Sequence, residues 1–77
     1  MDVEKLVKMA NEIAAFFEAE PDRAVALAGI AGHLKRFWDQ RMRRQLLRHL
    51  DEQSGAGLKV SARAAIEAHR EQLTPRG

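Results

Sequence analysis

The chain has 77 residues, 45% of them hydrophobic and 31% charged, with 13 Lys and Arg against 11 Asp and Glu. This length gives room for one domain, and the composition predicts that the chain folds. Its lack of cysteine excludes a disulfide framework, a thiolate zinc site, a cysteine-ligated iron–sulfur cluster and a thiol nucleophile. No apolar run approaches the ~20 residues of a membrane span, and the first residues do not resemble a signal peptide, so the cytoplasm is the default expectation.

Charge is unevenly distributed along the chain. Residues 1–22 carry two basic and six acidic side chains, residues 23–50 carry seven basic and one acidic, and residues 51–77 carry four of each. A basic centre of this kind attracts nucleic acid or an acidic protein surface, and it also pairs with an acidic segment of its own chain. Charge alone leaves these alternatives open.

The apolar pattern predicts an all-α fold, a small bundle of three to four short helices that forms a single domain over residues 1–77. The first helix is expected over residues 3–19, where apolar side chains recur at helical spacing. These are Val3, Leu6, Val7, Ala10, Ile13, Ala14 and Phe17. Met9 and Phe16 widen this face to about half of the circumference, which is more than one neighbouring helix covers. Pro21 ends the helix, and Asp22 is expected to cap the next one.

The second helix is expected over residues 23–38, with an apolar stripe that ends in Phe37 and Trp38. Each of these two aromatic side chains is expected either in the core or in a pocket of a partner. Gly29 and Gly32 lie away from the stripe, and each costs about 1 kcal/mol relative to alanine inside a helix. We interpret them either as sites of close approach by the backbone of another helix or as tolerated weak positions.

The third helix is expected over residues 40–53, with Asp39 as its N-cap. Its apolar stripe consists of Met42, Leu46, Leu47 and Leu50. Arg41, Arg44 and Arg48 line the opposite side at helical spacing. Arg43 lies on the apolar side, where an arginine either extends past the core or meets a carboxylate of another element.

A glycine-containing turn follows, in which Gly55 or Gly57 suits the left-handed conformation that ends a helix. The last helix is expected over residues 61–73, with a tail at residues 74–77. Because its apolar side is mostly alanine, we expect this helix to be the least firmly anchored.

The sequence predicts no catalytic, cofactor-binding or metal-binding residues, and therefore no enzyme activity of this chain by itself. His33, His49 and His69 do not have the spacing of metal ligands. No carboxylates are placed to act as an acid and base pair, and no glycines form a phosphate-binding loop.

A small helical DNA-binding domain is the alternative function. It would use the basic 35–48 segment, with Arg41, Arg44 and Arg48 along the phosphates and with Gln40, Arg41 and Gln45 as the residues able to reach the bases. The modest net charge of +2 and the acidic first segment argue against this alternative.

Three blocks of the sequence resemble one family. They are residues 6–17 (LVKMANEIAAFF), residues 29–43 (GIAGHLKRFWDQRMR), and Gly57 and Leu58 with the helix after them. The family is the delta subunit of cytoplasmic, molybdenum-containing, NAD-dependent formate dehydrogenases, and the Phe-Trp-Asp-x-Arg-Met-Arg block is the most specific part. Gln40 stands where the family commonly has proline, and both residues fit a first helical turn.

The resemblance implies a noncatalytic accessory subunit without a redox centre. Its implied partners are a large alpha subunit with bis-molybdopterin guanine dinucleotide and iron–sulfur clusters, a beta subunit with FMN, and a gamma subunit with a cluster. The implied complex interconverts formate plus NAD⁺ with CO₂ plus NADH, and the delta subunit supports its assembly or stability. No nucleic acid or membrane partner is implied.

The first helix has a wider apolar face than one neighbouring helix covers, and the centre of the chain bears several arginines. Both features predict a surface for docking on the large subunit. The residues expected to bind the partner are Phe16, His33, Trp38, Arg41, Arg43 and Arg44. Aromatic side chains and arginine are enriched among the residues that dominate protein–protein interfaces.

Overall fold

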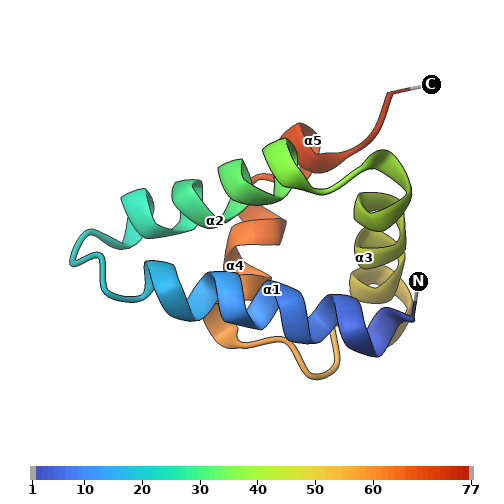
Figure 1. Cartoon of the computed structure of the whole chain (residues 1–77), viewed down its shortest axis with the longest axis horizontal. Coiled ribbons are helices and arrows are strands. Elements are labelled where there is room, and N and C mark those ends of the chain that lie inside the picture. Colours follow the sequence, from blue (N-terminus) through green and yellow to red (C-terminus); the bar gives the residue numbers. More distant parts are fainter. Residues whose placement is uncertain (1, 77) are drawn as a thin grey trace.

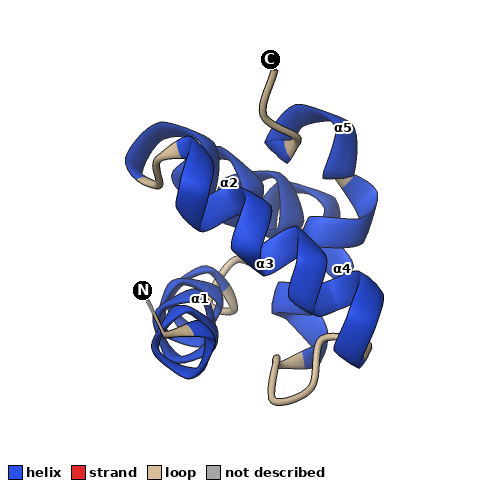
Figure 2. Cartoon of the chain, turned by 90° about the vertical axis from the view of Figure 1, so that its right-hand side faces the viewer, coloured by secondary structure: helices blue, strands red, loops and turns tan. Residues whose placement is uncertain are grey.

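The computed structural model describes residues 2–76 and confirms the all-α fold, with no strand in this part of the chain. Its helices are α1 (Val3–Phe17), α2 (Arg23–Phe37), α3 (Gln40–Gln53), α4 (Val60–Ala68) and α5 (Arg70–Leu73). α1 and α2 lie side by side and antiparallel, and α3 crosses them at the end away from their connecting turn (Figure 1). Seen along α1, α3 crosses in front and α4 lies to the right of α1 (Figure 2), where it packs against both α1 and α2.

Aspartate residues are the N-caps of the first three helices. Asp2 accepts a hydrogen bond from the backbone N–H of Glu4, and Asp22 accepts from those of Ala24 and Val25. Asp39 accepts from the N–H of Met42 at 2.8 Å. Each bond satisfies a donor that the first helical turn leaves unpaired, so the sequence-based prediction of caps at Asp22 and Asp39 is confirmed.

The core lies where α1, α2, α3 and α4 meet. Its buried residues are Leu6, Ala10, Ala14, Ile30, Leu34, Trp38, Leu46, Leu47, Leu50, Leu58, Ala62, Ala65, Ile66 and Leu73. Every helix contributes at least one of them, so the apolar stripes predicted from the sequence converge. Complete burial of a leucine or isoleucine side chain stabilises the fold by about 1.5–3 kcal/mol, so this cluster is the main source of stability.

Helix α4 is the central helix of the fold, and the prediction that it is the least firmly anchored is wrong. It packs against α1, α2 and α5, and Ala62, Ala65 and Ile66 are completely buried. Small side chains let neighbouring helices approach closely, and the alanines that suggested a weak anchor are buried between these helices.

The helix expected over residues 61–73 is divided at His69, whose backbone (φ −116°, ψ 27°) is not helical. The resulting bend buries Leu73 at the end of α5. Two short hydrogen bonds join α5 to α3, from Arg70 Nη1 and Nη2 to the two carboxylate oxygens of Asp51, at 2.8 and 2.6 Å. The hydrogen bonds and charge of Arg70 lower the pKa of Asp51 below its ordinary value.

The turn between α3 and α4 contains three left-handed residues, Ser54 (φ 55°), Gly55 (φ 66°) and Gly57 (φ 89°). This confirms the expectation that glycine in this turn supplies the left-handed conformation. At Gly57 the turn also passes close to α1, as shown by the 3.3 Å that would separate an added Cβ from Val7 Cγ1.

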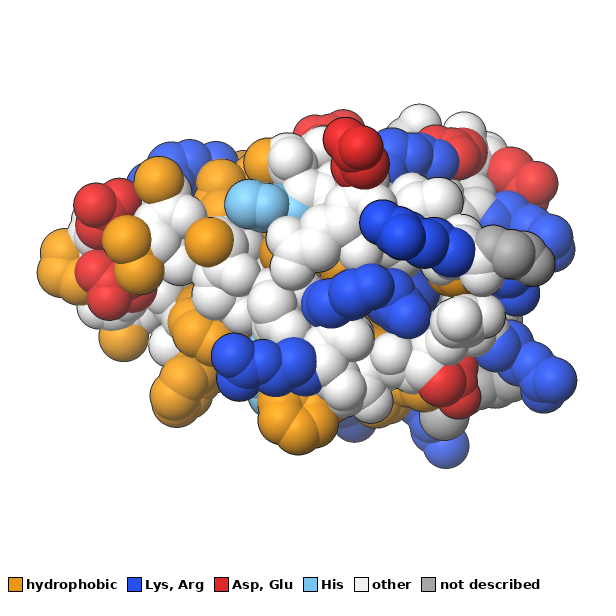
Figure 3. Space-filling model, turned by 90° about the horizontal axis from the view of Figure 1, so that it is seen from above, with side chains coloured by type: hydrophobic (Ala, Val, Ile, Leu, Met, Phe, Trp, Pro, Cys, Tyr) orange, Lys and Arg blue, Asp and Glu red, His pale blue; other side chains and the backbone are white. Residues whose placement is uncertain are grey.

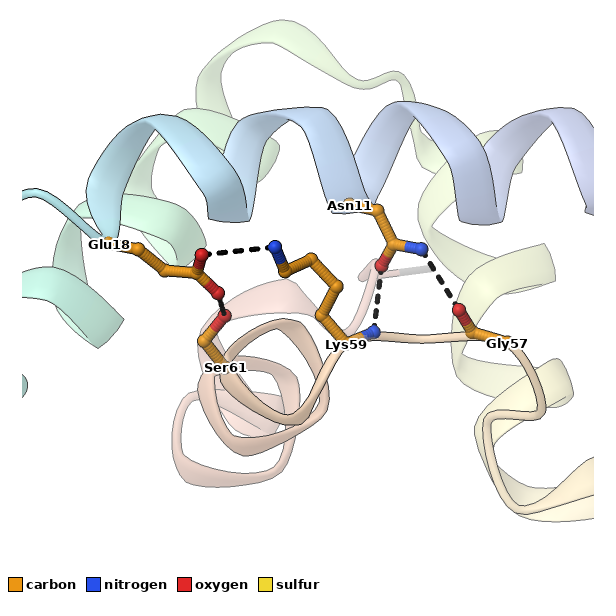
Figure 4. Close-up of polar contacts among 5 residues, drawn as sticks. All are labelled: Asn11, Glu18, Gly57, Lys59 and Ser61. Carbon is orange, nitrogen blue, oxygen red and sulfur yellow. Dashed lines mark hydrogen bonds and ion pairs between the residues drawn. The ribbon is translucent and has the colours of Figure 1, made fainter.

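Polar contacts fasten this turn along one side of α1 (Figure 4). The Asn11 amide donates to the carbonyl of Gly57 at 2.9 Å and accepts from the N–H of Lys59 at 2.8 Å. Farther along α1, the Glu18 carboxylate accepts from the Ser61 hydroxyl at 2.7 Å and pairs with Lys59 Nζ at 3.0 Å. The hydrogen bonds from Ser61 and Lys59 lower the pKa of Glu18 below its ordinary value.

Candidate functional site

An apolar groove runs between α1 and α2, formed by two adjoining hollows of about 330 and 360 Å³ that share Glu12, Ile13 and His33. We call it the α1–α2 groove. Its lining residues are Met9, Glu12, Ile13, Phe16, Phe17, His33, Phe37, Trp38 and Met42. On α1, Met9, Ile13 and Phe16 follow helical spacing and therefore share a face. This face is distinct from the one that buries Leu6, Ala10 and Ala14.

Two phenylalanine side chains stand exposed on the walls of the groove. Phe16 on α1 is 76% exposed and Phe37 on α2 is 68% exposed. The Phe16 ring meets Phe17 edge-to-face, with centroids 5.2 Å apart, and the Phe37 ring lies 4.6 Å from the ring of His33. Exposed aromatic side chains beside an apolar hollow are typical of a protein-binding surface.

From the sequence, Phe37 and Trp38 were each expected either in the core or in a pocket of a partner. In the structure, the two side chains differ in burial. Trp38 is only 4% exposed and belongs to the core, whereas Phe37 is mostly exposed. The reason is local: Trp38 follows the last residue of α2 with an extended backbone (φ −97°, ψ 133°). The chain therefore leaves the helical path at Trp38, and the indole packs into the core and forms part of the floor of the groove.

Gly29 lets the Phe17 ring form part of the groove wall. A Cβ added at Gly29 would lie 2.5 Å from Phe17 Cε1 and 2.6 Å from Cδ1, well inside contact distance. At Gly32 an added Cβ would meet nothing within 4 Å. Gly29 is therefore a site of close approach, made by a side chain of α1 and not by its backbone. Gly32 is a weak helical position that the fold tolerates.

A basic ridge lies on α3, formed by Arg41, Arg44 and Arg48, which are all exposed. Together with Gln45 they line a shallow hollow of about 280 Å³. Within residues 2–76, the ion pairs join Lys59 to Glu18 and Arg70 to Asp51, so none of the ridge arginines forms an ion pair in this range. On the face seen in Figure 3, hydrophobic side chains gather toward the turn between α1 and α2, and most of the visible Lys and Arg side chains lie toward α3.

Arg43 differs from the ridge arginines because it points into the molecule. It is 8% exposed, and its Nη1 donates to the carbonyl of Leu73 at 3.3 Å. Its Nε has no hydrogen-bond partner in the described part of the chain. The sequence predicted that Arg43 either extends past the core into water or meets a carboxylate, and both predictions are wrong. Its side chain instead binds the backbone at the end of α5.

The six residues expected to bind a partner therefore occupy three places. Phe16 and His33 line the α1–α2 groove with Trp38 beneath them, Arg41 and Arg44 belong to the basic ridge, and Arg43 lies inside. Sequence reasoning did not select Glu12, an exposed carboxylate that lines both hollows. Glu12 lies three residues after Met9 and four before Phe16, and this helical spacing could have assigned it to the same face.

No group of three or more His, Cys, Asp or Glu side chains in residues 2–76 is arranged to hold a metal ion. No helix of the described chain has the length and apolar character needed to cross a membrane.

Comparison with sequence models of known families gives a match over most of the chain. The sequence model of the family described as NADH-dependent formate dehydrogenase delta subunit FdsD matches residues 5–66 of this chain. The matched range contains every residue of the groove and of the ridge, and it ends before α5. No curated protein and no solved structure matches the chain.

Proposed function

The chain belongs to the family of NADH-dependent formate dehydrogenase delta subunits, and from this premise we propose that it is a noncatalytic accessory subunit. It docks on the large molybdenum subunit and supports the assembly or stability of the complex. That complex, in the cytoplasm, interconverts formate plus NAD⁺ with CO₂ plus NADH.

The observation that carries this proposal is the pair of exposed rings, Phe16 and Phe37, on the walls of the α1–α2 groove. Complete burial of a phenylalanine side chain is worth about 1.5–3 kcal/mol. A chain of 77 residues has a small core, so leaving two such side chains in water is a substantial loss. A partner that covers the groove recovers this stabilisation.

Each expected binding residue has a role in this proposal. Phe16 and His33 contact the partner directly, and Trp38 supports them from the floor of the groove. Arg41 and Arg44 pair with carboxylates or carbonyl oxygens of the large subunit, since arginine suits such contacts at interfaces. Arg43 acts indirectly by keeping α5 in place.

The redox chemistry belongs to other chains in this proposal. Bis-molybdopterin guanine dinucleotide and iron–sulfur clusters reside in the alpha subunit, FMN in beta, and a further cluster in gamma. A chain without cysteine offers no thiolate for a cluster, which suits a subunit that holds none of these groups.

The test is coexpression of the tagged chain with the other formate dehydrogenase subunits, followed by affinity capture and size-exclusion chromatography. The expected result is coelution with the large molybdenum subunit, abolished by Phe16→Asp combined with Phe37→Asp. Val60→Asp is the matched control, because Val60 is 78% exposed and lies outside the groove. Coelution that survives the double substitution would remove the groove from the proposal.

Two other results would change the assignment. Formate oxidation that depends on coexpression, without coelution, would indicate a transient assembly factor. Absence of both, together with salt-dependent binding to duplex DNA that Arg41→Ala and Arg44→Ala weaken, would favour the DNA-binding alternative.

A further inference from the structure

We infer that the α1–α2 groove binds a single amphipathic helix of the partner, and that this helix lies antiparallel to α1 and parallel to α2. This inference rests on the proposed function and adds the shape, direction and charge of the bound segment. Three observations support it: the spacing of the groove residues, the opposite charges at its two ends, and a carboxylate at its middle.

The spacing of the apolar residues fits a helix. On α1, Met9, Ile13 and Phe16 form a row at intervals of four and three, and on α2 His33 and Phe37 are four residues apart. Such rows are the ridges that flank the groove into which a third helix packs. The bound helix thus presents large apolar side chains on one face at the same intervals.

Opposite charges at the two ends of the groove set the direction. At the end formed by the α1–α2 turn, Glu20 and Asp22 outnumber the one cation of Arg23, whereas the Glu18 carboxylate is turned toward Ser61 and Lys59 and is paired there (Figure 4). At the other end, Lys35, Arg36 and Arg41 outnumber the one carboxylate of Asp39. The charged residues of the two ends lie in the segments next to the groove residues Phe17, Phe37 and Met42.

A helix carries a partial positive charge at its N-terminus and a partial negative charge at its C-terminus. The favourable orientation therefore places the N-terminus of the bound helix beside the acidic turn and its C-terminus beside the basic end. Since α1 runs toward the acidic turn and α2 runs away from it (Figure 1), the bound helix is antiparallel to α1.

Glu12 specifies a charge on the bound helix. Its side chain is exposed, lines both hollows and makes no ion pair with another residue of the range 2–76. Covering the groove removes part of the water around this carboxylate, which is costly unless a cation replaces it. The middle of the bound helix therefore bears a lysine or arginine at the border of its apolar face.

Photo-crosslinking in the coexpressed complex tests the direction. The tagged chain carries p-benzoylphenylalanine in place of Phe16, of Phe37 or, as the control, of Val60, and the crosslinked peptides are identified by mass spectrometry. Phe37 shares a hollow with Met9, and Met9 lies two helical turns, or about 10 Å, from Phe16 along α1. The expected result is one partner segment crosslinked by both groove positions.

In that segment, the site reached from position 16 precedes the site reached from position 37 by about seven residues, and position 60 does not reach the segment. The reverse order, two unrelated partner segments, or a second copy of this chain as the crosslinked species would each overturn the inference. If even the unsubstituted chain fails to copurify with the large subunit, the proposed function fails as well. Copurification with a wrong crosslinking pattern refutes only the helix.

The charge at the middle is tested by Glu12→Lys, with Glu67→Lys as the matched control on the exposed side of α4. We expect Glu12→Lys to speed dissociation of the chain from the immobilised complex about three- to tenfold, the range for loss and reversal of one peripheral ion pair. Glu67→Lys leaves the rate unchanged. Equal rates for the two variants would overturn the assignment of a cation opposite Glu12.

Discussion

The two glycines within α2 respond in opposite ways to replacement by alanine. In the interior of a helix, alanine is favoured over glycine by about 1 kcal/mol. At Gly32 the added Cβ meets nothing within 4 Å, so Gly32→Ala stabilises the protein by up to that amount. At Gly29 the added Cβ lies 2.5 Å from Phe17 Cε1 and 2.6 Å from Cδ1, whereas carbon atoms in good contact are about 3.5–4.0 Å apart.

The Phe17 ring must therefore move by about 1 Å, although it packs on the core and against Phe16. Overpacking of this kind costs about 1–3 kcal/mol, which outweighs or cancels the helical gain. The two variants should consequently differ by about 1–3 kcal/mol, with Gly29→Ala the less stable. For a domain of this size, each 1 kcal/mol shifts the Tm by about 4–8 °C.

Thermal unfolding followed by circular dichroism measures this difference. Combining Gly29→Ala with Phe17→Leu should recover part of the loss, because the smaller side chain vacates the position of the ring, and a double-mutant cycle isolates that coupling. Equal stabilisation by Gly29→Ala and Gly32→Ala would refute the reasoning, since it would mean that Phe17 does not lie against Gly29.

Three further predictions concern polar contacts. Asn11→Ala removes both hydrogen bonds to the α3–α4 turn and should cost about 1–3 kcal/mol in urea unfolding. Arg43→Met loses one hydrogen bond and should cost about 1 kcal/mol, whereas Arg43→Glu places a carboxylate in a buried site and should cost about 3 kcal/mol or more. Glu18→Gln combined with Asp51→Asn should flatten the loss of stability in acid.

The acid effect has a definite sign. Hydrogen bonds and charge from their partners lower the folded-state pKa of Glu18 and of Asp51 below the ordinary values of 4.5 and 3.8. Both carboxylates therefore stabilise the fold above these values, and their contribution is lost as the pH falls through the lower folded-state pKa values. Unfolding free energies measured from about pH 6 down to pH 2 should fall less steeply in the double variant, and parallel curves would contradict the prediction.

Controls separate these effects from general damage. Gln53→Ala, at the exposed end of α3, should leave the urea midpoint almost unchanged. Similar stabilities of Arg43→Met and Arg43→Glu would show that Arg43 is not buried. Stability of Asn11→Ala equal to that of the unsubstituted chain would show that the turn does not depend on its amide.

Local signals in the sequence determined the helices and most of their ends. Asp22 and Asp39 cap helices because their carboxylates reach backbone N–H groups two or three residues away, which is a contact set by short-range geometry. The left-handed backbone at Gly55 and Gly57 follows in the same way from the absence of a Cβ. The family was also recognisable, because its characteristic blocks lie within continuous stretches of sequence.

Tertiary packing decided the place of α4, the fates of Phe37 and Trp38, and the assembly of the candidate site. Helical periodicity shows which residues share a face but not which neighbour covers that face, since this depends on contacts between residues far apart in the chain. The alanines of α4 form a weak apolar stripe in the sequence, but in the fold they are buried because α1 and α2 pack against this helix. The groove forms where α1 and α2 pack against each other, with the Phe17 ring lying on Gly29, and this packing places Phe16, Glu12 and His33 around one hollow.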